Sequence, residues 1–224
     1  MTSERFTPAA GRPGLSALYD PVLALTTRER KFRRVLVEQA LAAAPSVILD
    51  LGCGTGTLAI QLAHAIRSAR VIGLDGDPDA LRRAAEKAHA ASAEIELIEA
   101  FATAIPLPDH SVDCVTCSLV LHHLSPTAKA RALGEAHRVL RPRGLLLIAD
   151  WGAAHDPLMR AAFLAVQLLD GFQTTRAHAE GELPRLIARS GFTGTPLDRL
   201  RTAWGTLALV TCAPSQRDQN ERAA

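Results

Sequence analysis

The sequence predicts one α/β domain built on a Rossmann-like, doubly wound sheet of seven strands, in which the last strand runs antiparallel. Short apolar runs typical of buried strands alternate with helical patterns, which favours a mostly parallel sheet covered on both faces. The last two strand candidates are joined only by a tight link at Trp204-Gly205, so they must pair as an antiparallel hairpin. A length of 224 residues suits one sizeable core rather than two.

The elements follow in a regular order after residues 1–16, which are rich in Pro, Gly and Ala and are expected to be mobile. A helical pattern over residues 18–44 ends at Pro45, because proline cannot continue a helix. Strands are expected at Val47–Leu49, Val71–Leu74, Glu94–Glu99, Cys114–Ser118, Leu145–Asp150, Thr195–Thr202 and Gly205–Cys212. Helices are expected at Leu58–Ser68, Pro78–Ala91, Thr127–Leu140, His155–Leu169 and Glu182–Ser190.

A glycine-rich turn follows the first strand. In the run Val47-Ile-Leu-Asp-Leu-Gly-Cys-Gly-Thr-Gly56, glycines recur at alternate positions, and without Cβ atoms they let the backbone bend sharply and lie close to a ligand. The next strand ends in Asp75, and a carboxylate at that neighbouring strand tip accepts both hydroxyls of a ribose. The sequence therefore predicts a nucleoside-bearing ligand at the N-terminus of the helix after the turn.

The spacing of the glycines indicates which nucleoside. A dinucleotide-binding turn requires a third small residue where this chain has Thr57. The run instead resembles the first motif of class I S-adenosylmethionine-dependent methyltransferases. Two further runs, Pro106–Leu124 and Arg138–Trp151, resemble the fourth-strand and fifth-strand blocks of that family. The resemblance covers residues 45–152 and the C-terminal hairpin, and points to small-molecule methyltransferases of the ubiquinone/menaquinone-biosynthesis type.

The resemblance implies that residues 1–224 form a single methyltransferase domain. Its parts would be an N-terminal helical cap (18–44), a cofactor-binding half (45–152), substrate-side helices (153–195), a C-terminal hairpin (196–212) and a polar tail (215–224). A cytoplasmic location is expected, because the N-terminus lacks a signal pattern and the four scattered cysteines form no disulfide framework.

S-adenosylmethionine is the cofactor that the resemblance implies, with S-adenosylhomocysteine as product and no metal. The implied contacts are Asp50, Gly52, Cys53 and Gly54 for the methionine end, Asp75 and Gly76 for the ribose, Phe101 and Ala102 for the adenine, and Ser118 and Leu119 for the methyl side. Phe101 departs from the family, many of whose members carry an acid there that accepts a hydrogen bond from the adenine amino group. Losing one such bond costs about 0.5–1.5 kcal/mol, so we expect a weaker preference for adenine rather than loss of binding.

The candidate catalytic residues are His122, His123 and Tyr19. The histidines follow the fourth strand, where a nucleophile would meet the methyl group, and His123 would orient or deprotonate an acceptor hydroxyl. A helix-capping or cofactor-covering role is the simpler alternative for both. Tyr19 lies in the segment that folds over the cofactor in relatives, where it either contacts ligand or packs. Further candidates are Asp150, Trp151 and His155 at the end of the fifth strand and just beyond it, and Asp170 and Phe172 between two helices.

The composition limits the classes of molecule that this chain is expected to bind. A net charge of +2 and an aromatic content of 4% argue against nucleic acid, and no apolar run approaches the roughly 20 residues of a membrane span. Cys114 and Cys117 would point to opposite faces of one strand, so they cannot share a metal ion. The basic run Arg28–Arg34 is interpreted as the solvated face of the first helix, with contact to an acidic substrate as the alternative.

The predicted function is transfer of the S-adenosylmethionine methyl group to a small organic acceptor by in-line displacement, with proximity and orientation as the main catalytic device. The alternatives are a non-catalytic S-adenosylmethionine-binding regulatory subunit and an NAD(P)-dependent reductase. An apolar or aromatic acceptor is suggested by an apolar stripe, although helical spacing also explains this stripe by core packing: Leu158, Met159, Phe163, Leu164 and Leu168. Nothing in the sequence indicates an oligomeric state.

Overall fold

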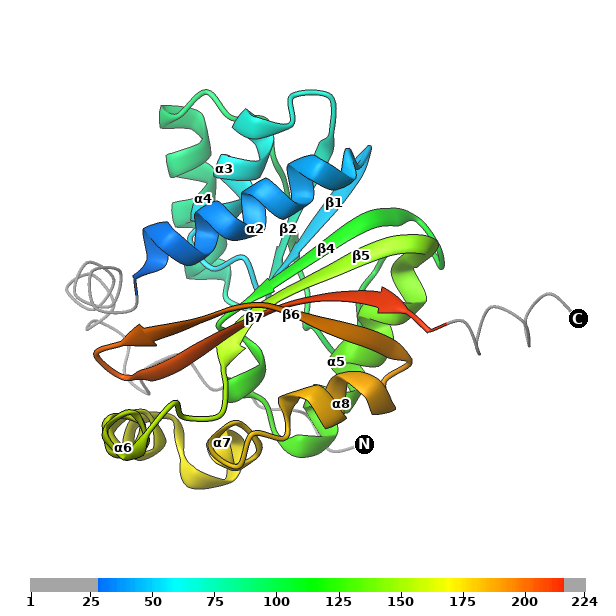
Figure 1. Cartoon of the computed structure of the whole chain (residues 1–224). Helices are drawn as coiled ribbons and strands as arrows, with labels where there is room; N and C mark the ends of the chain where they lie inside the picture. Colours follow the sequence, from blue (N-terminus) through cyan, green and yellow to red (C-terminus); the bar gives the residue numbers. More distant parts are fainter. Residues whose placement is uncertain (1–27, 216–224) are drawn as a thin grey trace, which may run out of the picture.

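The computed structural model describes residues 28–215 and shows a seven-stranded sheet in the order β3-β2-β1-β4-β5-β7-β6 (Figure 1). β1 to β5 pair in parallel, whereas β7 runs antiparallel to both β5 and β6. The predicted fold class, with its antiparallel last strand, is therefore confirmed. The strands are β1 (Val47–Leu51), β2 (Arg70–Asp75), β3 (Glu96–Glu99), β4 (Val112–Ser118), β5 (Leu140–Trp151), β6 (Phe192–Thr202) and β7 (Gly205–Pro214).

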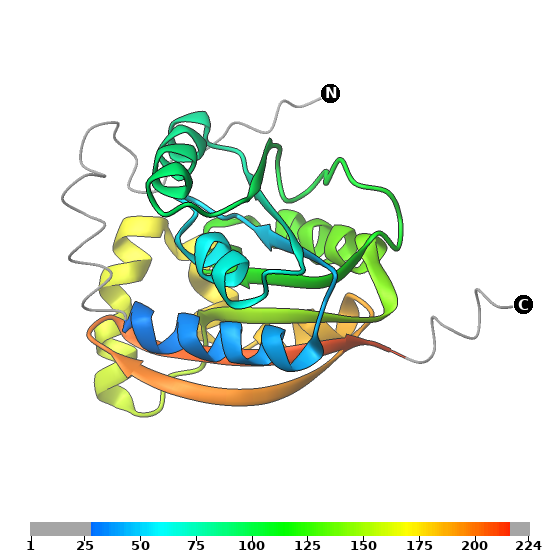
Figure 2. The same ribbon diagram turned by 90° about the horizontal axis from the view of Figure 1, so that it is seen from above.

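Helices cover both faces of the twisted sheet (Figures 1 and 2). One hydrophobic core joins α2, α3 and α6 to one face, and a second core joins α5 and α8 to the other. No helix among residues 28–215 is both long and apolar enough to cross a membrane. The helices are α2 (Glu29–Ala43), α3 (Thr57–Ala65), α4 (Pro78–Ala90), the 3-10 helix η1 (Leu121–His123), α5 (Pro126–Val139), α6 (Pro157–Asp170), α7 (Phe172–Ala179) and α8 (Leu183–Arg189).

Three helices begin at the same local signal, a capping side chain followed by proline. Asp77, Ser125 and Asp156 each accept a hydrogen bond from a backbone N–H of the first turn of α4, α5 and α6 respectively. The next residue in each case is proline, whose missing N–H and fixed φ suit the first helical position. The starts of these helices are thus determined locally.

The four cysteines are buried and unpaired, and they lie on both sides of the sheet. Cys114 belongs to the core beneath α2 and α3, whereas Cys117 and Cys212 belong to the core beneath α5 and α8. Successive side chains of a strand alternate between faces, so this separation follows from the spacing of Cys114 and Cys117. The two thiols point away from each other, as predicted.

The predicted elements agree with the structure in type and order, but several boundaries differ; β6, for example, begins at Phe192 rather than Thr195. β5 begins at Leu140 rather than Leu145, because its first residues lie where β7 does not pair with it and a strand edge tolerates Pro142. α7 was not predicted, since its eight residues show no clear apolar periodicity. α2 begins at Glu29. The expectations for residues 1–16, the first part of 18–44, Tyr19 and most of the tail concern residues outside the described range.

The parallel strands place their carboxyl ends at one edge of the sheet. Asp50 of β1 lies in register with Thr116 of β4, and Asp75 is the last residue of β2. Asp150 of β5 is the residue before the end of that strand. In open α/β sheets this edge is where ligands bind.

Arg138 fastens α5 to the segment that leads from β3 to β4. Its guanidinium donates hydrogen bonds to the carbonyl oxygens of Ile105 and Leu107, both at 2.8 Å, and to the carboxylates of Asp109 and Glu135 at 2.7–2.8 Å. The planar fork of arginine satisfies all of these acceptors at once. This residue therefore holds the whole segment against the sheet.

We expect Arg138→Met to lower the free energy of unfolding by about 2 kcal/mol, because two carbonyls and a partly buried carboxylate lose their donor. Urea denaturation measures the change. Arg82→Met is the matched control, since the ion pairs of Arg82 on α4 are exposed and its loss should leave stability nearly unchanged. Equal effects of the two substitutions would contradict the role given to Arg138.

Candidate active site

The glycine turn between β1 and α3 is shaped by three left-handed residues. Gly52, Gly54 and Gly56 have φ values of 71°, 52° and 73°, which favour glycine. A Cβ on Gly52 would lie 2.4 Å from Val120 Cγ2, and one on Gly56 would lie 2.9 Å from the Cβ of Ala84. A Cβ on Gly54 would meet no atom within 4 Å. The first and third glycines therefore permit close packing, and the second leaves backbone exposed to a free space.

Asp50 is a buried carboxylate beneath this turn. Its Oδ1 accepts a hydrogen bond of 2.7 Å from the hydroxyl of Thr116, while Oδ2 is buried and has no partner among the described residues. Burial raises the pKa of Asp50 to about 6, although the bond from Thr116 and the positive charge of Arg33 oppose the rise. A buried acceptor without a donor is costly, and a cationic or N–H-bearing ligand would relieve that cost.

Asp75 connects the end of β2 to the glycine turn. Its Oδ2 accepts from the Gly54 N–H at 2.8 Å and its Oδ1 from the Asp77 N–H at 2.9 Å. Burial raises its pKa, and these two bonds work against the rise. The contact between Asp75 and Gly54 shows that the two predicted cofactor-binding segments meet.

Phe101 lies beside the tip of β2. A Cβ on Gly76 would come within 3.0 Å of two atoms of the Phe101 ring, so the ring lies directly over that glycine. Phe101 is nevertheless 44% exposed, so one face of its ring is accessible. Ala102 packs at the border of the core.

The end of β4 carries a second special backbone position. Leu119 has φ of 56°, a left-handed conformation that is uncommon for a non-glycine residue, and its N–H donates to the Ala149 carbonyl at 2.8 Å. This turn directs the chain from Ser118, the last residue of β4, into Val120 and η1. Because Val120 also contacts Gly52, the glycine turn and η1 lie side by side.

His122 of η1 is fixed by the buried carboxylate of Asp150. The Nδ1 of His122 lies 2.8 Å from Asp150 Oδ1, and the carboxylate also accepts from the N–H groups of Leu121 and Trp151 at 2.7–2.8 Å. A carboxylate bonded in this way only accepts, so Nδ1 carries a proton and the orientation of the ring is fixed. The ring is oriented by strand β5 rather than by solvent.

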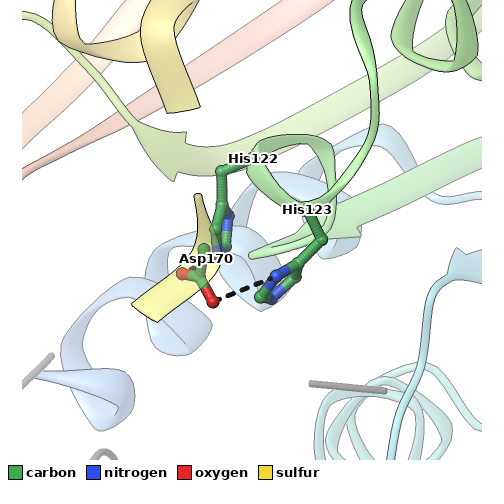
Figure 3. Close-up of side chains that lie close together, drawn as sticks. All are labelled: His122, His123 and Asp170. Carbon is green, nitrogen blue, oxygen red and sulfur yellow. Dashed lines mark ion pairs between the residues drawn. The ribbon is translucent and has the colours of Figure 1, made fainter. Parts of the chain in front are cut away.

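His123 and Asp170 complete an acceptor-side cluster, which we define as His122, His123 and Asp170 (Figure 3). Asp170, at the end of α6, lies 3.7 Å from His122 Nε2 and 3.5 Å from His123 Nδ1. Burial, followed by the adjacent His122, lowers the pKa of His123, which favours a neutral ring. The sequence identified both histidines, but it did not show that Asp170 faces them.

Two further buried basic side chains, those of His178 and Lys129, lie next to this cluster. His178 of α7 donates from Nδ1 to the Trp151 carbonyl at 2.7 Å, and burial lowers its pKa. The ammonium of Lys129 donates to the carbonyls of Leu124 and Thr174, and burial lowers its pKa to about 8. Through Lys129, α7 is held against α5 and η1.

Two other candidates have structural roles. His155 bonds through its N–H and ring to the hydroxyl of Thr206, at 3.1 and 2.8 Å, and thereby links the end of β5 to β7. Trp151 is buried in the core against Phe163 of α6. Phe172 remains exposed. Cys53 is buried beneath the glycine turn, where it lies against Gly73 of β2.

Arg33 is largely buried, although the sequence predicts a solvated helix face for its run. Its side chain is 21% exposed, it pairs with Glu29 at 2.7 Å, and its Nε is buried without a hydrogen-bond partner among the described residues. Its charge also acts on Asp50. In the sequence, the only sign that Arg33 turns inward is that it directly follows Phe32, which is buried.

Comparison with known proteins agrees with this geometry. Residues 48–144 match the family described as "Methyltransferase domain". A ubiquinone/menaquinone biosynthesis C-methyltransferase UbiE from Blochmanniella pennsylvanica is 32% identical over 205 residues, which cover 82% of this chain and 79% of that protein. A demethylmenaquinone methyltransferase from Thermus thermophilus is 40% identical over 121 residues, 54% of each chain. The magnesium protoporphyrin IX methyltransferase of Synechocystis, solved with bound SAH, superposes with a TM-score of 0.66 at 19% identity over 84% of each chain.

The fold, the glycine turn and these matches define the class: the chain belongs to the class I S-adenosylmethionine-dependent methyltransferases. Within that class it is of the UbiE type. Three of the curated relatives, the Thermus protein among them, are matched over only 54–57% of their own length, so the chain spans about half of those proteins.

We expect Asp50→Asn to stabilise the free protein at pH 8 by about 2–3 kcal/mol, since a pKa raised from 3.8 to about 6 reflects the cost of burying the charge. The native state binds more protons than the unfolded state between these two values. The stability of the parent protein therefore falls as pH rises through that window, and the advantage of the variant shrinks as pH falls from about 6 towards 4. Chemical denaturation at several pH values measures it. An advantage independent of pH would contradict this account.

Proposed function

We propose that this protein transfers the methyl group of S-adenosylmethionine to a small, apolar or aromatic organic acceptor. The observation that carries the proposal is the buried, unpartnered Oδ2 of Asp50 beneath a turn whose central glycine leaves free space. A site of this kind fits a ligand that brings a cationic donor close to the backbone. The methionine end of S-adenosylmethionine carries such an ammonium group.

Each part of S-adenosylmethionine has residues at the site that could hold it. Asp50 would hold the ammonium group and Arg33 the carboxylate of the methionine end. Asp75 would accept the ribose hydroxyls, exchanging part of its bonding to the turn for them. Phe101 would cover one face of the adenine, because its ring is exposed beside Gly76 and supplies stacking where an acid is absent. Ser118 and Leu119 would line the methyl side.

The chain's main catalytic task would be positioning. The sulfonium of the cofactor supplies an activated methyl group and leaves as a neutral thioether, so no residue has to stabilise a charged leaving group. The contact between Gly52 and Val120 fixes η1 beside the glycine turn, which brings His122 and His123 to the side where the acceptor would enter. A lowered pKa makes His123 a weak base in the free protein, so we favour an orienting role for it.

The acceptor class follows from the surface next to the cluster. Of the apolar stripe on α6, Met159 and Phe163 are buried, so core packing explains them. Five large apolar residues of α6 and the start of α7 are exposed, and three of them lie within two residues of Asp170 in the chain: Leu158, Leu164, Leu168, Leu169 and Phe172. An exposed apolar surface beside hydrogen-bonding groups suits an apolar or aromatic molecule that carries a polar group. Demethylmenaquinone, named for the Thermus relative, belongs to this chemical class.

The test is calorimetric titration with S-adenosylhomocysteine, followed by an assay of S-adenosylhomocysteine release from S-adenosylmethionine with a panel of quinols, phenols and carboxylic acids. We expect micromolar binding that Asp75→Ala weakens at least tenfold, and turnover with an apolar aromatic acceptor. Absence of binding would sink the cofactor assignment. Binding without turnover of any acceptor would instead support a non-catalytic binding subunit.

Arg33→Met should weaken S-adenosylhomocysteine binding about 10–100-fold, the range for loss of a partly buried charged hydrogen bond of about 1.5–3 kcal/mol. Binding of adenosine, which has no carboxylate, should be unchanged. Arg34→Met is the matched control, because Arg34 is 69% exposed and pairs only with Glu38 on the same helix among the described residues. If both variants bind like the parent protein, Arg33 does not contact the cofactor.

A further inference from the structure

The acceptor-side cluster holds its three ligand atoms at separations that suit a shared metal ion. The separations from Asp170 to His122 Nε2 and to His123 Nδ1, 3.7 and 3.5 Å, exceed the 2.7–3.2 Å of a hydrogen bond. Two ligand atoms bound to Zn²⁺ at about 2.0–2.1 Å with tetrahedral angles lie about 3.3 Å apart. All three ligand atoms lie within 4.8 Å of one another.

The carboxylate of Asp170 faces only the two imidazoles within residues 28–215. Its backbone carbonyl accepts from the Thr174 hydroxyl, which holds the end of α6 beside α7. A cation between the two imidazoles and this largely buried carboxylate would compensate its charge.

His122 already has the hydrogen-bond partner that typically orients a metal-binding histidine. Metal-bound histidine characteristically donates its other ring N–H to a carboxylate, which fixes the tautomer and orients the ring. His122 does this with Asp150 at 2.8 Å, and Asp150 is anchored in turn by the backbone N–H groups of Leu121 and Trp151. The other ring nitrogen of His122, Nε2, faces Asp170 (Figure 3).

Charge and access are also suitable. Asp150 and Asp170 bring two carboxylates to the cluster, and Lys129 is the cation whose field reaches Asp150. The His122 side chain is 5% exposed and that of His123 is 36% exposed. One side of the cluster is therefore held by protein and the other is open to an incoming ion.

We propose that His122, His123 and Asp170 bind a divalent transition-metal ion, with Zn²⁺ as the best fit to two imidazoles and one carboxylate. Three protein ligands leave a fourth position open, as in catalytic rather than structural zinc sites. The open position lies on the side of η1 that the proposed acceptor would approach. This placement, though not the metal binding itself, rests on the proposed function.

The experiment is calorimetric titration of ZnCl₂ into the full chain, prepared without a histidine tag, treated with EDTA and desalted. We expect one equivalent to bind with a Kd of micromolar or lower, and Co²⁺ to give the visible absorption of a low-symmetry four-coordinate site. Asp170→Asn and His123→Ala each remove one ligand at a partly exposed position and should weaken binding at least tenfold. Asp150→Asn should weaken it about 10–100-fold by loosening His122.

His89→Ala is the matched control, because His89 is an exposed histidine near the end of α4, outside the cluster, and its loss should leave the affinity unchanged. Thermal unfolding with and without Zn²⁺ establishes that each variant is folded. Failure of the parent protein to bind Zn²⁺, or binding that neither Asp170→Asn nor His123→Ala weakens, would overturn the proposal. S-adenosylhomocysteine titration in EDTA tests the cofactor site separately, so that failure of one assignment is distinguishable from failure of the other.

Discussion

Carboxylates at the ends of buried strands are the constraint on which this structure depends. β1, β2 and β5 carry Asp50, Asp75 and Asp150 at or next to their last residues, and all three strands end at the same edge. Asp75 and Asp150 are each satisfied by backbone N–H groups, and Asp150 also by His122. Only one of the two carboxylate oxygens of Asp50 has a hydrogen-bond partner among the described residues. The fold therefore tolerates one unmet acceptor at the position where a ligand would complete it, which is where natural proteins place functional sites at the expense of stability.

The two halves of the site are coupled by packing rather than by polar contacts. Gly52 and Val120 approach so closely that no side chain fits between the glycine turn and the segment before η1. Leu119 accepts a left-handed conformation to make that approach, which costs of order 1–3 kcal/mol. Because interiors are close-packed, a shift in the turn is transmitted directly to His122 and His123. The distance between the cofactor turn and the histidines is thus set by the backbone.

Local patterns predicted the sheet and the meeting of the glycine turn with the end of β2. Apolar runs, capping residues followed by proline and the glycine spacing are all contained in short stretches of chain, and the rule that parallel strands share an edge brought Asp75 to Gly54. The remaining features depend on contacts between distant segments. Arg33 lies at the border of a buried helix face, where periodicity alone does not decide its direction. Asp170 meets the histidines because α6 and α7 return to η1, and no sequence pattern encodes that return.

The distribution of the four cysteines has a consequence for the chemistry of the chain as a whole. Burial raises the pKa of every thiol, so none reacts readily while the sheet is closed. Cys114 reports on the layer beneath α2 and α3, whereas Cys117 and Cys212 report on the layer beneath α5 and α8. The rate at which each thiol is alkylated therefore measures how often its layer opens. A ligand that binds at the carboxyl edge and stabilises the closed sheet would lower these rates without contacting a sulfur atom.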